Sequence, residues 1–367
     1  MKRSYFTAIA AAISFIVLIL DAKTAFSGAL EGVKLCTQAL IPSLFPFFIL
    51  SMVLTSTLTG QRIPFLALIG RLCGMPRGSE SLLLVGLLGG YPVGAQSISQ
   101  AYARGQLTGK DAHRLLGFCS NAGPAFLFGM VAGQFSCMSA SWVLWGIHIL
   151  SALLTAILLP GKSAECVTMP LQKPMKVSQA LEKSVRVMAT VCGWVILFRI
   201  VVAFFARWFL WLLPSWAQTT LIGAMELANG CCSLAAIEPE GLRFVITAGL
   251  LSMGGLCVAM QTVTVTEGLG TGLYFPGKLV QTLISLAIAG LLQYGLFPEQ
   301  PVNALPWSIF SAVLVAILAA AMNFPKKAVA FPGKVVYNRE NDYTEVGKCS
   351  FGSGSKNPAP TASSARS

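Results

Sequence analysis

The stretch LLGFCSNAGPAFLFGMVAGQFSCMSASWVLWGIHILSALLTAILLPG, residues 115–161, contains no aspartate, glutamate, lysine or arginine. A transmembrane helix needs about 20 consecutive apolar residues, so this run is long enough for two spans. The small polar residues 139–141 divide it, and its first part carries a further break at 119–124, CSNAGP. The run therefore predicts membrane-spanning helices, one of which is interrupted.

The rest of the chain has the same character. Hydrophobic residues make up 55% of it and charged residues only 11%, whereas a soluble domain is about 25% charged. Further apolar runs lie at 5–20, 40–54, 81–100, 187–212, 218–236, 244–266, 276–296 and 305–323. The sequence predicts an all-α polytopic membrane protein, a helical bundle of about eight spans and re-entrant segments broken by glycine and proline.

The basic residues predict an orientation and not a nucleic-acid partner. The formal net charge is +12, but the lysines and arginines lie in the N-terminus, the connections and the tail instead of forming one stripe. Cytoplasmic loops of membrane proteins are enriched in these residues. We therefore expect a bacterial cell-membrane protein whose N-terminus, 162–186 linker and C-terminus are cytoplasmic.

The N-terminal region has two interpretations. Lys2 and Arg3 precede the short apolar run 5–20, which is typical of either a cleavable signal peptide or a retained span. No clear cleavage site follows, so we favour a span. Residues 24–39 mix charged and apolar positions and predict an amphipathic helix at the membrane interface.

These patterns predict six segments. They are a first span (1–23), a first half (24–161), a cytoplasmic linker (162–186), a second half (187–300), a last span (301–325) and a disordered tail (326–367).

Breaks within spans are the candidate functional features. Unpaired backbone groups are costly in lipid, so a broken helix indicates backbone that is buried in protein or lines a cavity. The breaks lie at 89–94, 120–124 and 254–255, and polar side chains accompany them. The alternative is that the glycines only permit close helix packing. The predicted substrate-binding residues are Tyr91, Gln96, Ser120, Asn121, Glu226, Asn229 and Gln261.

Ionisable residues in apolar stretches add to this prediction. Glu226 needs a proton, a partner or water in such a place, and Asn229 shares its helix face. Glu226 could instead lie among the headgroups. Arg199 either pairs with Glu226 or extends its long side chain to the interface. His148 is more typical of a packed residue than of a ligand or proton relay.

The sequence argues against an enzyme, a metal site and a bound cofactor. It contains ten cysteines and two histidines but no C-x-x-C pair and no zinc-site spacing. Nucleophile-elbow, H-E-x-x-H and Walker A motifs are also missing. The predicted partners are membrane lipids, a small polar solute and a coupling ion.

The two halves look related. Residues 83–97, LLVGLLGGYPVGAQS, align weakly with 249–263, GLLSMGGLCVAMQTV. If the halves form an inverted repeat, their breaks should enter from opposite sides and meet near the middle of the membrane. The charge pattern permits this arrangement if Arg104, Lys110 and Arg114 lie outside, against the usual bias.

Several motifs resemble those of the nucleoside recognition (Gate) domain proteins, and within them the sporulation integral membrane protein YlbJ group. The motifs are IPSLFPF (41–47), GGYPVGA (89–95), FCSNAGP (118–124), ELANG (226–230) and GGLCVAMQ (254–261). The resemblance implies a multi-span membrane protein of endospore formers that acts as a transporter or gate, and the domain name suggests nucleosides. Two departures are Ser120, where a second asparagine is expected, and the loose second-half motif at 256–258.

Two functions follow from these observations. The first is a sporulation-associated transporter or permease for a small polar solute, with nucleosides among the candidates. The second is a non-transporting membrane scaffold required for assembly of the spore cortex or envelope. Saturable, competable flux separates them, because only a transporter shows it.

Overall fold

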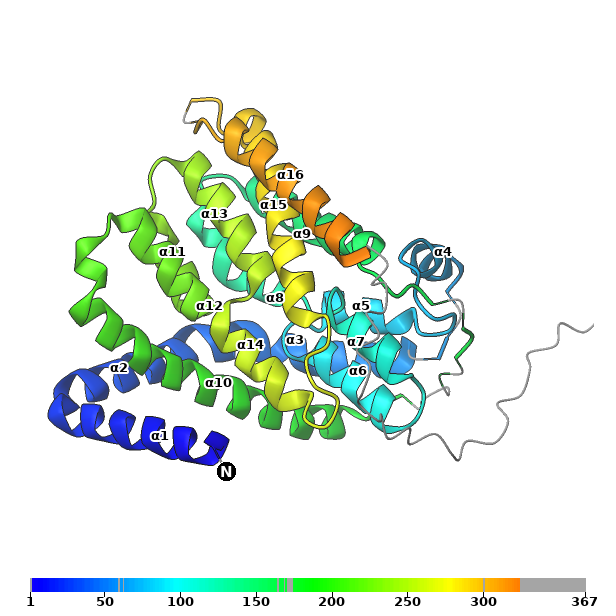
Figure 1. The fold of residues 1–367 in the computed structure, drawn as a ribbon, viewed down its shortest axis with the longest axis horizontal. Coiled ribbons are helices and arrows are strands. Elements are labelled where there is room, and N and C mark those ends of the chain that lie inside the picture. Colours follow the sequence, from blue (N-terminus) through cyan, green and yellow to red (C-terminus); the bar gives the residue numbers. More distant parts are fainter. Residues whose placement is uncertain are drawn as a thin grey trace, which may run out of the picture. The chain divides into compact units, whose positions relative to one another are not determined.

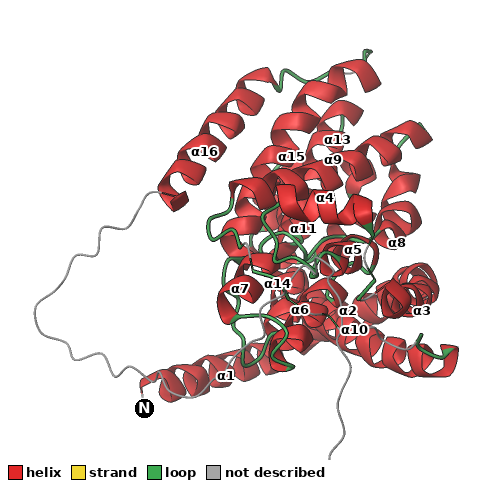
Figure 2. Cartoon of the chain, turned by 90° about the vertical axis from the view of Figure 1, so that its right-hand side faces the viewer, coloured by secondary structure: helices red, strands yellow, loops and turns green. Residues whose placement is uncertain are grey.

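The computed structural model describes residues 2–58, 60–61, 63–163, 165–167, 169, 174–299 and 301–323. The predicted tail, residues 326–367, lies outside this part. The described residues form helices and turns with no β-strand (Figure 2). Their α-helices are α1 (Lys2–Leu20), α2 (Ala22–Leu35), α3 (Ile41–Leu58), α4 (Pro64–Leu72), α5 (Ser81–Leu88), α6 (Val93–Ala103), α7 (Gly109–Leu116), α8 (Pro124–Phe126), α9 (Met138–Leu158), α10 (Val177–Trp208), α11 (Ser215–Met225), α12 (Leu227–Cys232), α13 (Glu240–Met253), α14 (Gly255–Val265), α15 (Tyr274–Leu296) and α16 (Leu305–Asn323).

Short helices of other types join some of these elements. Two π-helices, η1 (Cys36–Leu40) and η2 (Leu127–Val131), continue α2 into α3 and extend α8. Three 3-10 turns are η3 (Ala132–Gln134), η4 (Leu210–Leu212) and η5 (Leu234–Ala236).

Six helical segments among the described residues are long and apolar enough to cross a membrane. They are Ala22–Leu58, Met138–Leu158, Val177–Trp208, Glu240–Val265, Tyr274–Leu296 and Leu305–Asn323. This confirms the predicted all-α polytopic membrane protein. The apolar run 5–20 lies within α1, of which Ala11–Leu20 is a shorter apolar helix. The other remaining runs form shorter pieces, because breaks at 89–92, 117–123 and Glu226 divide them.

Two sequence boundaries differ from those of the structure. The expected interfacial helix at 24–39 is the first part of the continuous segment Ala22–Leu58, and it packs closely on α10. A Cβ placed on Gly28 would lie 2.9 Å from the Ile200 Cα, and Glu31 forms an ion pair with Arg199. The helix α10 begins at Val177, so the last part of the predicted 162–186 linker is helical.

The loops gather at two ends of the bundle, and hydrogen bonds show which loops share an end. At the end that contains residues 158–163 and 174–176, here called the linker end, Arg114 donates to the carbonyls of Gly74 and Pro160 at 3.0 and 3.1 Å. His113 Nε2 lies 2.7 Å from the Leu269 carbonyl oxygen. Asn323 donates to the Leu158 carbonyl at 2.8 Å.

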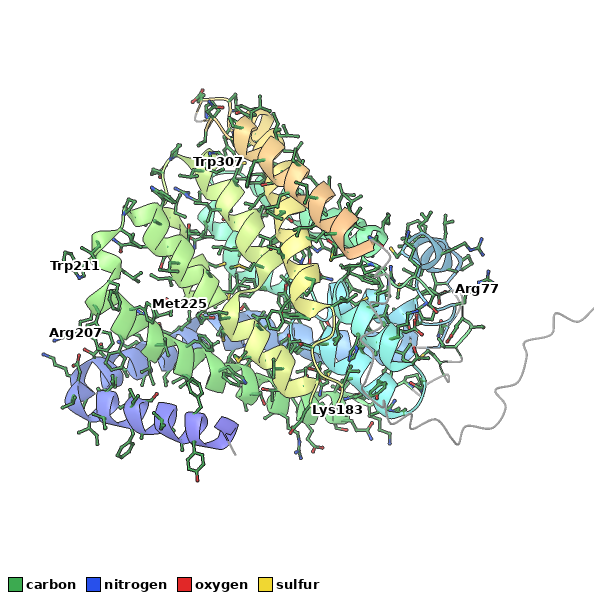
Figure 3. The ribbon with its side chains drawn as sticks, viewed as in Figure 1. Arg77, Lys183, Arg207, Trp211, Met225 and Trp307 are labelled. Atoms are coloured by element: carbon green, nitrogen blue, oxygen red, sulfur yellow. The ribbon has the colours of Figure 1, made fainter. Side chains whose placement is uncertain are left out.

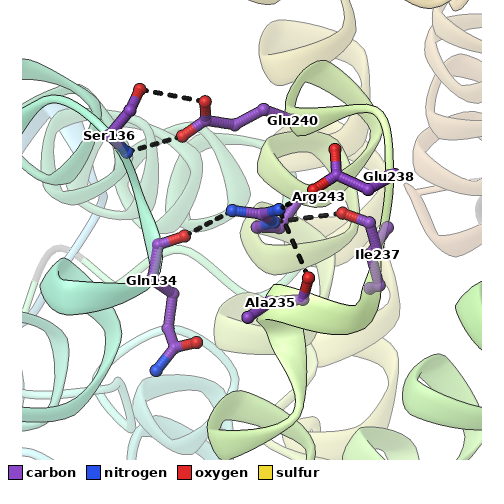
Figure 4. Close-up of polar contacts among 7 residues, drawn as sticks. All are labelled: Gln134, Ser136, Ala235, Ile237, Glu238, Glu240 and Arg243. Atoms are coloured by element: carbon purple, nitrogen blue, oxygen red, sulfur yellow. Dashed lines mark hydrogen bonds and ion pairs between the residues drawn. The ribbon is translucent and has the colours of Figure 1, made fainter.

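The opposite end, here called the far end, is held by a second set of contacts. Arg243 donates to the Gln134 carbonyl and to Glu238, each at 2.7 Å, and Glu240 accepts from Ser136 (Figure 4). In Figure 3, Arg77 lies toward the right and Lys183 toward the bottom, whereas Arg207 and Trp211 lie toward the left and Trp307 toward the top. The far end is therefore shared by residues 134–138, 209–215, 236–243, 297–299 and 301–304.

The chain path between these ends forms an inverted repeat. In the first half, the hairpin α5–α6 starts and finishes at the linker end, α7–α8 runs to the far end, and α9 returns (Figure 1). In the second half, α11–α12 starts and finishes at the far end, α13–α14 runs to the linker end, and α15 returns. The segments α2–α3 and α10 also run in opposite directions. Each half thus repeats the order of the other with reversed direction.

Two details of the predicted repeat are wrong. Arg104, Lys110 and Arg114 do not lie on the side opposite the linker: a Cβ on Gly161 would lie 3.7 Å from both Lys110 Cε and Arg114 Cδ. The inverted arrangement therefore agrees with the positive-inside bias, with no exception needed. The two halves also correspond differently from the predicted alignment. The break in 83–97 corresponds to the break at Glu226, and the break at 254 corresponds to the break at 117–123.

Candidate functional site

The helix breaks of each half pack against one another. A Cβ on Gly90, whose φ is +72°, would lie 2.9 Å from the Gly123 backbone nitrogen. A Cβ on Gly255, whose φ is +76°, would lie 2.8 Å from the Gly223 carbonyl oxygen. Positive φ and missing space both require glycine at these positions. Each half therefore brings the break of its hairpin against the break of its interrupted crossing segment.

Glu226 forms the break of the second hairpin. Its backbone is extended, with φ −140° and ψ 109°, so α11 ends there and α12 begins on the next residue. Its carboxylate accepts hydrogen bonds from the Ala228 and Asn229 backbone amides at 3.0 and 2.6 Å. A carboxylate at a helix N-terminus is favoured by the orphan amides and the helix dipole.

This capping role explains how Glu226 is held inside the bundle. Its side chain is only 2% exposed, so the alternative that it lies among the headgroups is wrong. No basic side chain of the described residues forms an ion pair with it, and Arg199 pairs with Glu31 instead. Of the two alternatives that the sequence left open for Arg199, the pair with Glu226 is therefore the one that the structure does not show.

An inner cavity of about 50 Å³ opens beside the Glu226 carboxylate. Tyr91, Glu226 and Gln261 supply its polar side chains. Apolar side chains from η1, α3 and α10 close the other side, namely Leu40, Leu44, Phe48, Val191 and Val195. Backbone from both halves completes the wall, at Gly89, Gly90, Ala122, Gly123, Leu227 and Ala228.

A buried lysine lies behind Tyr91. Lys278, on α15, is 4% exposed and donates hydrogen bonds to the Tyr91 hydroxyl at 3.1 Å and to Gln281 Oε1 at 2.7 Å. Its ammonium also lies 5.2 Å from the centre of the Tyr91 ring, which is within the range of a cation–π interaction. No carboxylate of the described residues pairs with it.

The same network crosses from one half to the other. Gln281 Nε2 donates to Asn121 Oδ1 at 3.0 Å, and Asn121 Nδ2 donates to the Phe118 carbonyl at 2.7 Å. Asn121 is completely buried, so both ends of its amide are used in fixing the break at 117–123. Its position is structural in this conformation, and it touches the inner cavity only through Gln281, Lys278 and Tyr91.

His148 supports the same break from α9. Its Nε2 accepts from the Ala122 amide at 3.0 Å, which assigns the proton to Nδ1, and Nδ1 lies 3.4 Å from Ser252 Oγ. Ser252 continues through Ser285 to Ser151. Both ring nitrogens therefore have partners, as expected for a packed histidine.

The structure brings together only part of the predicted set. Tyr91, Glu226 and Gln261 line the inner cavity. Ser120 is completely buried, and its hydroxyl has no hydrogen-bond partner among the described residues. Asn229 contributes its backbone amide to the Glu226 carboxylate, while its side-chain nitrogen has no partner in the described part of the chain. It does not share a helix face with Glu226, which precedes α12.

Gln96 belongs to a different cavity, of about 230 Å³, which we call the basic cavity. It lies toward the linker end between α3, α6 and α10. Its polar and charged lining residues are Thr55, Ser56, Gln96, Ser97, Gln100, Arg104, Gln106, Lys183 and Arg186. Its apolar lining residues are Met52, Leu82, Val85, Val93, Ala101, Met169, Met175 and Val187.

Sequence reasoning missed Lys278 and Gln281. Lys278 is the only charged residue between Glu267 and Glu299, and a lone lysine at the start of a span is a signal that could have been used. Gln281 follows three residues later and shares its helix face. Their partners, Tyr91 and Asn121, are more than 150 residues away in the chain, so no local pattern could reveal the contact.

Comparison with known proteins identifies a partial relative. The sporulation integral membrane protein YlbJ of Bacillus subtilis (strain 168) is 31% identical over 137 residues, which are 36% of this chain and 33% of that protein. The chain thus matches about a third of the relative's length. The resemblance to the YlbJ group is supported over that region.

The comparisons with family models and solved structures assign no family to the chain. No family model matches the chain, and no solved structure matches it. The assignment to the nucleoside recognition (Gate) domain proteins therefore stays a prediction. The multi-pass membrane location has two supports, the six spans and the membrane relative.

Proposed function

We propose that this chain is a sporulation-associated membrane transporter for a small polar solute, and that the inner cavity beside Glu226 is its binding site. The relative's name supports the link to sporulation. The observation that carries the transport proposal is the meeting of two breaks from opposite ends of the bundle at one buried carboxylate.

The helix ends at the breaks support a role in transport. Breaks near the middle of a membrane expose amides and carbonyls that must be satisfied, and secondary transporters use such groups for substrates and ions. Here the α12 amides hold the Glu226 carboxylate, and Tyr91 and Gln261 face the same space. Ionisable groups are expensive in a membrane, so a buried glutamate and a buried lysine near one cavity are typical of a functional site.

The small volume of the inner cavity indicates which conformational state the structure shows. About 50 Å³ is room for a few waters, because one water needs roughly 10–15 Å³ on this measure. Pockets for drug-sized ligands measure about 300–1,000 Å³. We infer a closed state that a solute of nucleoside size enters only after the hairpins separate.

The remaining assignments belong to this proposal. Tyr91, Glu226 and Gln261 contact the solute, whereas Ser120, Asn121 and Asn229 shape the breaks. The protein acts without chemical catalysis and without a cofactor, and it belongs to the Gate-domain proteins. The linker end is cytoplasmic, because it gathers Arg71, Arg77, Arg104, Lys110, Arg114, Lys162, Lys176, Lys183 and Arg186.

Uptake into proteoliposomes tests the proposal. The wild-type protein should show saturable uptake from a panel of radiolabelled nucleosides and small polar solutes, with competition by unlabelled solute. Glu226→Gln should abolish this uptake at an equal amount of reconstituted protein. The Glu182→Gln variant is the control, because Glu182 is exposed and, within the described part of the chain, forms an ion pair with Arg186 alone.

One observation favours the scaffold as the second candidate. The polar groups at the inner cavity have partners within the protein, and the cavity is small. In a spore-forming host, deletion of the gene should leave vegetative growth normal and produce heat-sensitive spores. Rescue by Glu226→Gln as complete as that by the wild type would favour the scaffold, whereas failure to rescue would favour transport.

A further inference from the structure

The basic cavity differs from the inner cavity in charge. Among the described residues, three cations, Arg104, Lys183 and Arg186, lie on its lining, and no aspartate or glutamate does. Side-chain amides and hydroxyls supply further hydrogen-bond donors, from Gln96, Ser97, Gln100 and Gln106. Glu182 pairs with Arg186 from outside the lining, across exposed side chains, where an ion pair is weak.

The shape of the basic cavity comes from successive turns of three elements. Val93, Gln96, Gln100 and Arg104 follow one stripe along α6, from the helix break to the linker end. Its inner end is apolar, with Met52 of α3 and Val187 of α10, and its outer end carries the cations. A cavity with donors and cations at an open rim and apolar walls deeper in suits an anionic group.

The inner cavity lies one helical turn further along the same elements. Phe48 lines the inner cavity and Met52 the basic cavity, and the pair Val191 and Val187 repeats this relation on α10. Four residues of α-helix rise about 6 Å. Because the inner cavity presents the Glu226 carboxylate, an anion is more stable on the linker side of Met52 and Val187.

We propose that the basic cavity is a binding site for an anionic phosphate-like group at the linker end, separate from the inner cavity. The group belongs either to a free solute anion or to the headgroup of an anionic lipid. The proposal stands independently of transport, since it concerns only binding at this end of the bundle.

Cysteine modification measures the local potential directly. Gln100→Cys places a thiol on the cavity lining, in a background in which Cys349 and the cysteines that are exposed in the described residues, Cys166 and Cys232, are replaced by serine. The rates are compared for a sulfonate-bearing and a trimethylammonium-bearing methanethiosulfonate reagent. Ala103→Cys is the matched control, because Ala103 is exposed on the same helix but does not line the cavity.

The expected ratio of the two rates, sulfonate over trimethylammonium, is about three- to tenfold higher for Gln100→Cys than for Ala103→Cys at low salt. The difference should shrink at 1 M salt, where the screening length is about 3 Å. Adding Arg104→Gln and Lys183→Gln should bring the ratio to the control value. Equal ratios at the two positions, or a ratio that these variants do not change, would overturn the proposal.

Protection of the same thiol separates the two sources of the anion. Slower modification with millimolar inorganic phosphate in detergent indicates a free anion. Slower modification in phosphatidylglycerol nanodiscs than in phosphatidylcholine nanodiscs, without added anion, indicates a lipid headgroup. If neither condition slows the reaction, the cavity binds no phosphate-like group and the proposal is wrong. Gln96→Cys repeats the measurement at a second lining position if Gln100→Cys does not fold.

Discussion

At the scale of single residues, the buried polar groups divide into those that hold the fold and those that face a cavity. Asn121 and His148 have partners on both sides and fix the first-half break. Glu226 caps α12 and also faces the inner cavity. Lys278 belongs to both classes, because it contacts Tyr91, which lines the inner cavity, and Gln281, which is part of the network that holds the fold.

Asn121→Ala should destabilise the protein. It removes the side-chain partner of the Phe118 carbonyl and the closer partner of Gln281 Nε2, which keeps a longer contact of 3.5 Å with the His148 carbonyl. An unsatisfied buried polar group costs about 1–3 kcal/mol. We expect a clear fall in the Tm of the detergent-solubilised protein and less protein in the membrane. Asn229→Ala is the control with a small effect, because its side-chain nitrogen has no partner in the described residues. Equal Tm changes for both variants would show that the Asn121 network contributes little.

Lys278→Met should separate stability from function. Burying an ammonium group costs several kcal/mol, and methionine has a similar length without the charge. The loss of a partner for Gln281 Oε1 offsets this gain, so the Tm should change less than in Asn121→Ala. Uptake, or rescue of spore heat resistance, should still be lost. A variant that keeps full activity would show that Lys278 is only a packing residue.

The sequence predicted these residues unevenly. Glu226, Tyr91 and Gln261 could be found because a polar side chain beside a helix break in an apolar run is expensive in lipid. Lys278 was missed because it lies near the start of a span, where a lysine is usually placed at the interface. The partner of Arg199 was also missed, since choosing Glu31 over Glu226 depends on α2 packing against α10.

At the scale of elements, the glycines at the breaks determine how closely the hairpins approach the crossing segments. The sequence identified the breaks, but not which of them pair. A glycine pair looks alike in a hairpin and in a crossing segment. A break belongs to a hairpin if the helix after it returns to the end of the bundle where the helix before it started. Only the contacts between the loops show whether it does so.

Gly90→Ala and Gly255→Ala should both destabilise the protein strongly. Each residue has a positive φ, and an added Cβ would lie within 3.0 Å of backbone atoms. Strain of this kind costs about 1–3 kcal/mol before any clash is added. Gly146→Ala, within α9, is the control: nothing lies within 4 Å of its added Cβ, and alanine favours a helix by about 1 kcal/mol. A neutral Gly90→Ala would contradict the close packing of the two breaks.

At the scale of the whole molecule, the two halves repeat with opposite direction. The sequence predicted this reversal from the basic linker, but it placed Arg104, Lys110 and Arg114 at the wrong end. The number of basic residues in each loop could not correct this placement. In sequence, a hairpin that returns to its starting end looks like a segment that crosses the membrane fully. The hydrogen bonds of Arg114 to Gly74 and Pro160 place these loops together.

The most direct test of the inverted arrangement is the sidedness of the two hairpin bases. Ala103 ends the first hairpin at the linker end, Ser215 begins the second at the far end, and both are exposed. In the background without Cys166, Cys232 and Cys349, a membrane-impermeant thiol reagent should label Ser215→Cys in intact cells. It should label Ala103→Cys only after permeabilisation. Labelling of both positions from the same side would contradict the inverted repeat, and with it the meeting of the two hairpins at Glu226.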